Sequence, residues 1–137
     1  MTSSRRLLTL LCCALGATLA TGCANKPPAD SAGRMASPAA LAALSPGLKE
    51  GIALYDNGDY NGAIRRLGAA DVAGAPKAVQ LEALKYAAFS YCVTARQTLC
   101  RQQFDKALKL DASFDLEPGE HGHPLWGPVF VKAKKSR

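Results

Sequence analysis

Five cysteines supply the most reactive side chains of this 137-residue chain. Cys12 and Cys13 lie in an apolar run near the N-terminus, Cys23 follows that run, and Cys92 and Cys100 lie much later in the chain. A thiol can form a disulfide, carry an acyl chain, bind a metal or act as a nucleophile. Which chemistry each cysteine performs depends on its compartment and on the elements that position it.

The residues before Cys23 read as a targeting segment. Arg5 and Arg6 precede the apolar stretch Leu7–Leu19, and the small residues 20–22 lead directly to Cys23. The stretch is too short to span a bilayer comfortably and has the layout of a signal peptide. The junction resembles the lipobox of bacterial lipoproteins, in which this cysteine is acylated and becomes the new N-terminus.

The lipobox resemblance implies a membrane anchor. It predicts a signal peptide over 1–22 and a lipid on Cys23, held in the membrane by about 0.8 kcal/mol per buried methylene. Ala24 replaces the Asp that retains lipoproteins in the inner membrane of enteric bacteria, so we expect an outer-membrane protein facing the periplasm. Ala20 stands where the family prefers Leu. An ordinary secretory signal cut nearby, or an uncleaved anchor, is therefore the alternative.

Two helical hairpins are expected after the anchor. Residues 23–44, rich in Pro, Ala, Ser and Gly, predict a flexible linker, with a short helical turn near 39–44 as an option. Residues 45–137 predict a helical domain that starts at Ser45-Pro46. Gly58 should end the first helix, and Asp59 should cap a second one that runs through Ala70.

The second hairpin should repeat the first. A helix from Pro76 to about Ala95 is expected, followed by one that Thr98 caps and that ends at Leu110. Ala63, Leu67 and Ala70 of the first hairpin correspond to residues 37 positions later. The partners in the second hairpin are Cys100, Phe104 and Ala107.

These hairpins resemble tetratricopeptide repeats. The first unit carries the small and apolar residues of that signature, namely Gly51, Leu54, Gly58, Tyr60, Ala63, Leu67 and Ala70, and the second unit fits it less closely. The resemblance implies an all-α fold of two hairpins. A C-terminal capping helix around Phe130 should complete it, with Trp126 packed onto the open end. The words CRQQFDKALKLDASFDLEPGE and HPLWGPVF also resemble the TssQ family of small lipoproteins associated with type VI secretion clusters.

On the tetratricopeptide pattern, the first helix of each unit lines a concave face that binds a peptide or protein. The residues that the pattern places there are Ile52, Tyr55, Asp56, Lys85 and Phe89. Exposed aromatic side chains beside charges suit partner recognition. The alternative is that these residues pack the core.

Cys92 and Cys100 should meet across the second hairpin. Once Cys23 is acylated, they are an even pair in an oxidising compartment, which favours a disulfide. The short loop would give the bond an entropic contribution of about 2–3 kcal/mol. Two buried free thiols are the alternative.

Enzymatic chemistry is not expected. The sequence has no paired-carboxylate arrangement, phosphate-binding loop or Ser-His-Asp candidate. His121 and His123 lack a third metal ligand at a suitable spacing and read as loop residues, so we expect no metal and no cofactor. The net charge of +6 includes Arg5 and Arg6, and without them it is 15 − 11 = +4. That excess forms no basic, aromatic-interleaved cluster, so nucleic acid is not an expected partner.

The expected function is therefore that of a lipid-anchored interaction or assembly module of an envelope complex, with a protein or peptide as its partner. A pilotin-like structural anchor without a binding groove is the alternative.

Overall fold

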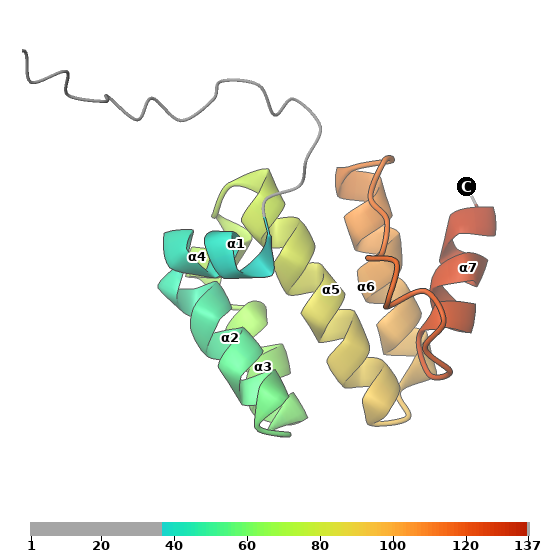
Figure 1. Ribbon diagram of the computed structural model, residues 1–137, viewed down its shortest axis with the longest axis horizontal. Coiled ribbons are helices and arrows are strands. Elements are labelled where there is room, and N and C mark those ends of the chain that lie inside the picture. Colours follow the sequence, from blue (N-terminus) through green and yellow to red (C-terminus); the bar gives the residue numbers. More distant parts are fainter. Residues whose placement is uncertain (1–36, 137) are drawn as a thin grey trace, which may run out of the picture. The chain divides into compact units, whose positions relative to one another are not determined.

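The computed structural model describes residues 37–136, which form helices joined by turns and loops and contain no strand (Figure 1). The predicted all-α fold is therefore confirmed. The predicted signal peptide, Cys23 and most of the predicted linker lie outside the described residues. The helices are α1 (Pro38–Leu44), α2 (Pro46–Asp56), α3 (Tyr60–Leu67), α4 (Ala70–Ala73), α5 (Lys77–Val93), α6 (Gln97–Leu110) and α7 (Gly127–Lys135).

The first hairpin, α2 and α3, has the caps that its sequence predicts. The Ser45 hydroxyl accepts a hydrogen bond from the Leu48 N–H at 3.2 Å and so begins α2. Gly58 adopts φ +80°, a left-handed conformation that glycine takes without a steric penalty. The Asp59 carboxylate then accepts from the Gly62 N–H at 2.8 Å and begins α3.

One predicted boundary is wrong. α3 ends at Leu67 rather than Ala70, because Gly68 favours termination, and the chain starts a separate short helix that buries Val72. α1 lies where the sequence left a short helical turn open at the end of the predicted linker. The Ser37 hydroxyl caps this helix, and its Leu41 side chain is buried in the core. The Ala-Leu composition of this stretch favours helix, and burial of Leu41 fixes it.

The second hairpin, α5 and α6, reproduces the turn of the first at an offset of 37 residues. Ala95, like Gly58, has a positive φ, here +59°. The Arg96 N–H donates to the Tyr91 carbonyl at 2.8 Å, as Asp59 donates to Leu54 at 2.9 Å. The two turns therefore share one backbone conformation at the 37-residue offset that side-chain spacing predicts. Thr98 does not cap α6, because the helix already begins at Gln97.

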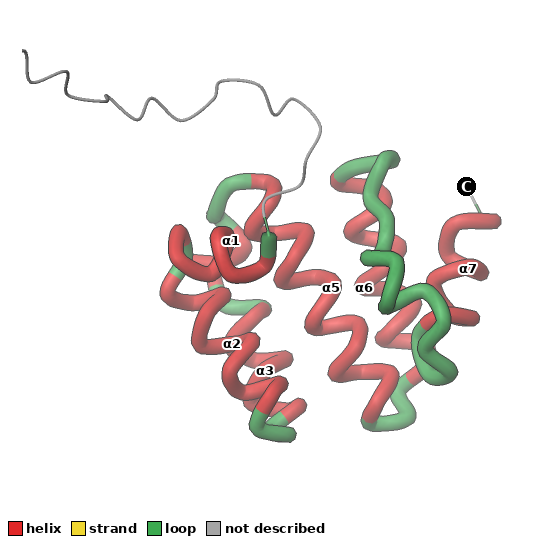
Figure 2. Tube along the Cα trace, viewed as in Figure 1, coloured by secondary structure: helices red, strands yellow, loops and turns green. Residues whose placement is uncertain are grey.

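α5 is the centre of the core, between the first hairpin on one side and α6 on the other (Figure 1). Buried side chains occupy most of its circumference, including Val79, Ala83, Ala88 and Cys92, and the side that carries Leu84 and Tyr91 is partly exposed. One hydrophobic cluster joins α5 to α1, α2, α3 and Val72 of α4, and a second joins it to α6, α7 and the loop between them. That loop is the long green segment between α6 and α7 in Figure 2.

Candidate functional site

The candidate site lies on the face formed by α2 and α5, which carries the five residues predicted to bind a partner. Asp56 is exposed, and Ile52 and Tyr55 are half-buried. Lys85 and Phe89 are only 3% and 2% exposed. The structure therefore corrects the prediction, because Lys85 and Phe89 pack in the interior and do not present an open surface.

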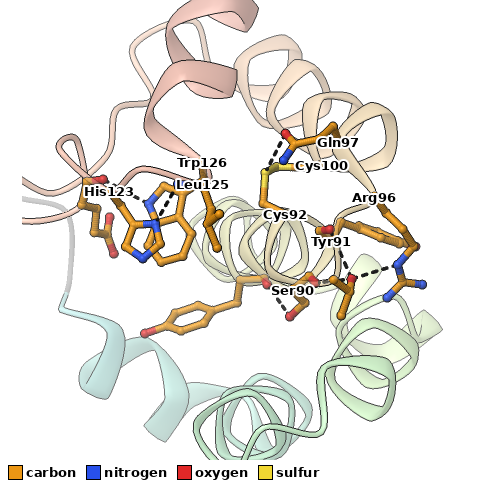
Figure 3. Close-up of a disulfide and its surroundings, with 12 residues drawn as sticks. Ser90, Tyr91, Cys92, Arg96, Gln97, Cys100, His123, Leu125 and Trp126 are labelled. Atoms are coloured by element: carbon orange, nitrogen blue, oxygen red, sulfur yellow. Dashed lines mark hydrogen bonds between the residues drawn. A yellow bond between two sulfur atoms is a disulfide. The ribbon is translucent and has the colours of Figure 1, made fainter.

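The segment between α6 and α7 covers these two side chains. The Trp126 ring stacks on Phe89, with ring centroids 4.1 Å apart, and its Nε1–H donates to the Glu120 carbonyl at 3.0 Å. The His123 ring stacks in turn on the Trp126 ring, with centroids 3.3 Å apart, beside Leu125 (Figure 3). Trp126 therefore packs on the second hairpin, as the sequence predicted, but against the inner side of α5.

The close fit of this segment depends on Gly127, the first residue of α7. A Cβ on Gly127 would collide with the carbonyl oxygen of His121, which lies in the covering loop. The missing side chain lets the helix begin directly against the loop and fixes Trp126 over α5.

A continuous row of aromatic rings crosses the α2–α5 face, which we call the aromatic row. Neighbouring ring centroids are 5.6 Å apart for Tyr60 and Tyr55, 5.2 Å for Tyr55 and Tyr86, and 5.9 Å for Tyr86 and Phe89. Trp126 follows Phe89. Edge-to-face pairs of this kind add about 0.5–1.5 kcal/mol each beyond the area they bury. The row therefore changes along its length from partly exposed tyrosines to a buried Phe–Trp stack.

The exposed end of the aromatic row carries neutral phenols. Burial, helped by the nearby Tyr60 hydroxyl, raises the pKa of Tyr55 to about 12. Burial also raises the pKa of Tyr86. Both hydroxyls therefore stay protonated at neutral pH and can donate or accept a hydrogen bond. With Asp56 beside Tyr55, this end can recognise polar groups as well as apolar ones.

Lys85 holds a buried ionic network beneath the covering loop. Its Nζ lies 3.0 Å from a carboxylate oxygen of Glu82 and 3.0 Å from one of Glu120. Burial opposes the charge of Lys85, but the two carboxylates outweigh it, so the pKa of Lys85 lies above its ordinary value. Burial also raises the pKa of Glu82, whose Oε1 accepts no aligned hydrogen bond. The network ties the covering loop to α5.

The histidines do not form a metal centre. His121 pairs with Asp115 at 3.2 Å, and the Nδ1 of His123 accepts from the Leu125 N–H at 3.3 Å. Across residues 37–136, no three His, Cys, Asp or Glu side chains are grouped to hold a metal ion. Both imidazoles therefore contact other residues of the loop that covers α5.

Cys92 and Cys100 are joined by a disulfide, shown in Figure 3. Their Cα atoms lie 5.2 Å apart, one near the end of α5 and the other near the start of α6. Both residues are fully buried, close to the core that Phe104 and Phe89 share. The bond closes the second hairpin at the end where Ala95 makes the turn.

Comparison with known proteins adds no assignment, since no family model, curated protein or solved structure matches the chain. None of the helices described is both long and apolar enough to cross a membrane.

Sequence reasoning missed Tyr86, Glu82 and Glu120 as parts of the site. Tyr86 had a usable signal, since it lies one residue beyond Lys85 and three before Phe89, on a helix already predicted. Glu82 had one as well, since it lies three residues before Lys85 on the same helix, whereas Glu120 had none, because only the path of the loop brings it to Lys85.

Proposed function

We propose that this chain is a lipid-anchored, tetratricopeptide-like module that faces the periplasm from the outer membrane and docks a protein or peptide of an envelope complex. The lipobox resemblance supports the anchor, and the resemblance to the TssQ family points to type VI secretion as the system. The turn conformation that recurs after 37 residues supports the tetratricopeptide-like arrangement.

The observation that carries the docking proposal is the exposed end of the aromatic row. Tyr55 and Tyr86 are half-buried, rigidly packed against each other and flanked by Ile52 and the exposed Asp56. Tyrosines held this way offer contact area with little loss of side-chain entropy on binding. We place the docking surface on these four residues, not on Lys85 and Phe89.

Site-specific photocrosslinking in the envelope tests the docking surface. A photoreactive amino acid at position 52 or 56 should crosslink to a defined partner, and one at Gln102, an exposed position on α6, should not. Adding Tyr55→Ala should weaken the crosslink from position 56. Crosslinking of equal strength from position 102 would contradict the proposal.

The anchor has its own test. Metabolic labelling with a palmitate analogue should mark the wild-type chain and leave Cys23→Ser unlabelled, and the variant should leave the membrane fraction. Equal labelling of both chains would show that Cys23 is not the lipidated residue.

A pilotin-like anchor without a groove is the second candidate, and one observation favours it. Trp126 and the loop before it already fill the inner side of α5, where the second repeat would offer its share of a groove. Under this function, Tyr55→Ala would leave assembly of the complex intact, whereas Cys23→Ser would abolish it. Loss of assembly with both variants would support the docking module.

A further inference from the structure

A second surface, on the opposite side of α5, is apolar and open. It is a groove of about 320 Å³ whose floor is α5 and whose walls are α3 and α4 on one side and α6 on the other. Its apolar lining includes Ile64, Leu67, Val72, Leu84, Ala87 and Tyr91. We call it the outer groove. None of the residues of the proposed docking surface lines it.

One face of α6 extends the outer groove at both ends. Gln103 and Lys106 line it, and Leu99 and Leu110 continue the same stripe at spacings of four, three and four residues. Leu99 and Leu110 are 37% and 38% exposed and are two of the few large apolar side chains left in solvent among the described residues. At 1.5 Å per residue the stripe is about 16 Å long, or three helical turns.

The charge of the outer groove has one sign. Lys106 is the only charged side chain in its lining, and no carboxylate lines it. Within the described part of the chain, the side chains of Lys106 and Gln103 have no hydrogen-bond or ion-pair partner. An occupant that carries a carboxylate opposite Lys106 would supply the missing charge.

We propose that the outer groove docks one amphipathic α-helix of a partner protein, about three turns long, with an apolar stripe toward α5 and an acidic residue opposite Lys106. A helix is the fitting occupant because the walls and floor are helices, whose backbone groups are already paired. The length of the Leu99–Leu110 stripe sets the length of the partner helix, and Lys106 sets the sign of its charge.

The test uses two fluorescent 14-residue helical peptides with the same leucine stripe, one with a central Glu and its twin with Lys there. Fluorescence anisotropy is followed with the full chain in lipid nanodiscs, and empty nanodiscs serve as the blank. We expect the Glu peptide to bind the wild-type chain. Lys106→Glu should weaken that binding about tenfold and should allow the Lys peptide to bind instead.

Matched variants distinguish binding in the outer groove from non-specific hydrophobic binding. Leu99→Ser and Leu110→Ser should each weaken the Glu peptide several-fold. Leu125→Ser, an equally exposed apolar side chain outside the groove, should have no effect, and neither should Lys49→Glu. All four side chains are in contact with solvent, so these variants should fold.

Three results would overturn the proposal. The first is that neither peptide binds. The second is that both peptides bind equally and Lys106→Glu changes nothing. The third is that sedimentation velocity shows a dimer of the chain that Leu99→Ser dissociates, because the groove would then be covered by a second copy.

Discussion

Replacing Lys85 with methionine should destabilise the domain through charge rather than through packing. Lys85→Met keeps most of the side-chain volume and removes the ammonium group that lies 3.0 Å from both Glu82 and Glu120. The Lys85 side chain is 3% exposed and that of Glu82 is 11% exposed, so Glu82 would remain a buried carboxylate without a cation.

The expected cost is about 3 kcal/mol of the free energy of unfolding at pH 7.5. Removing one partner of a buried ion pair costs about 3–5 kcal/mol. We take the lower end because the Glu120 side chain, 21% exposed, can turn toward water. With a urea dependence of about 1 kcal/mol per M for a domain of this size, the midpoint should fall by about 3 M. Urea unfolding followed by fluorescence of Trp126, the only tryptophan, measures the shift.

The loss of unfolding free energy in Lys85→Met should become smaller as the pH falls. Burial already raises the pKa of Glu82, and without Lys85 that pKa should lie higher still. A carboxyl whose pKa is raised in the folded state binds protons more tightly there than in the unfolded chain. Its charge therefore destabilises the folded state above the folded pKa, and the penalty disappears as the pH falls toward the unfolded value of about 4.3. At pH 5 the deficit of Lys85→Met should be clearly smaller than at pH 7.5.

Two further variants make this reasoning refutable. Lys77→Met removes an ion pair of 2.7 Å to Asp111, but the Lys77 side chain is 59% exposed, so its loss should lower the free energy of unfolding far less than the loss of Lys85. Adding Glu82→Leu to Lys85→Met should recover part of the lost stability, and it gives a folded sample if the single variant unfolds. A Lys85→Met deficit equal to that of Lys77→Met, or one independent of pH, would show that burial of charge is not the cause.

Three other predictions follow from the hairpins. Ala63→Leu adds volume at a position that is 0% exposed and should lower the free energy of unfolding by about 1–3 kcal/mol in a melting experiment. Ala53→Leu, at an exposed position on α2, should barely move the melting midpoint. Equal effects would show that Ala63 is not tightly packed. Ala95→Gly should raise the free energy of unfolding in urea by about 0.5–1 kcal/mol, because alanine is strained at φ +59° and glycine is not. A variant with a lower free energy of unfolding would contradict that backbone conformation. Mass spectrometry of unreduced peptides should find Cys92 linked to Cys100, and reductant should lower the free energy of unfolding by about 2–3 kcal/mol; two freely alkylated thiols would exclude the bond.

The control for Ala63 is taken from α2 for a structural reason. Ala69 belongs to the same helix if that helix runs through Ala70, as the sequence predicts, but in the structure it is half-buried and lies outside α3, because Gly68 ends that helix. A leucine at position 69 would therefore report on the cap of α4 and not on helix α3.

Local sequence was sufficient for the elements whose ends are fixed by neighbouring residues. Ser45, Gly58 and Asp59 act within three residues of themselves, so their capping and turn roles could be predicted from side-chain chemistry alone. The 37-residue repeat could likewise be predicted, because equivalent buried positions demand similar side chains. The turn at position 95 could not be predicted in this way, because alanine does not indicate a left-handed conformation, whereas glycine at the equivalent position 58 does.

The candidate site was harder to predict because it joins residues far apart in the chain. A helical-repeat pattern places Lys85 and Phe89 on an open inner face, and nothing within α5 says otherwise. Burial of both side chains depends on Glu120 and Trp126, which lie more than 30 residues later in an irregular loop. Where such a loop runs depends on long-range packing, including the close approach that Gly127 allows.

The sequence by itself determined the helices of the two hairpins and the 37-residue spacing of their turns, because helix capping and apolar periodicity are local properties. Only the tertiary structure decided which part of the α2–α5 face stays accessible, since Trp126 and Glu120 reach Phe89 and Lys85 from a loop far along the chain. It also decided that the space between α3 and α6 remains an open apolar groove, because no described segment of the chain packs into it.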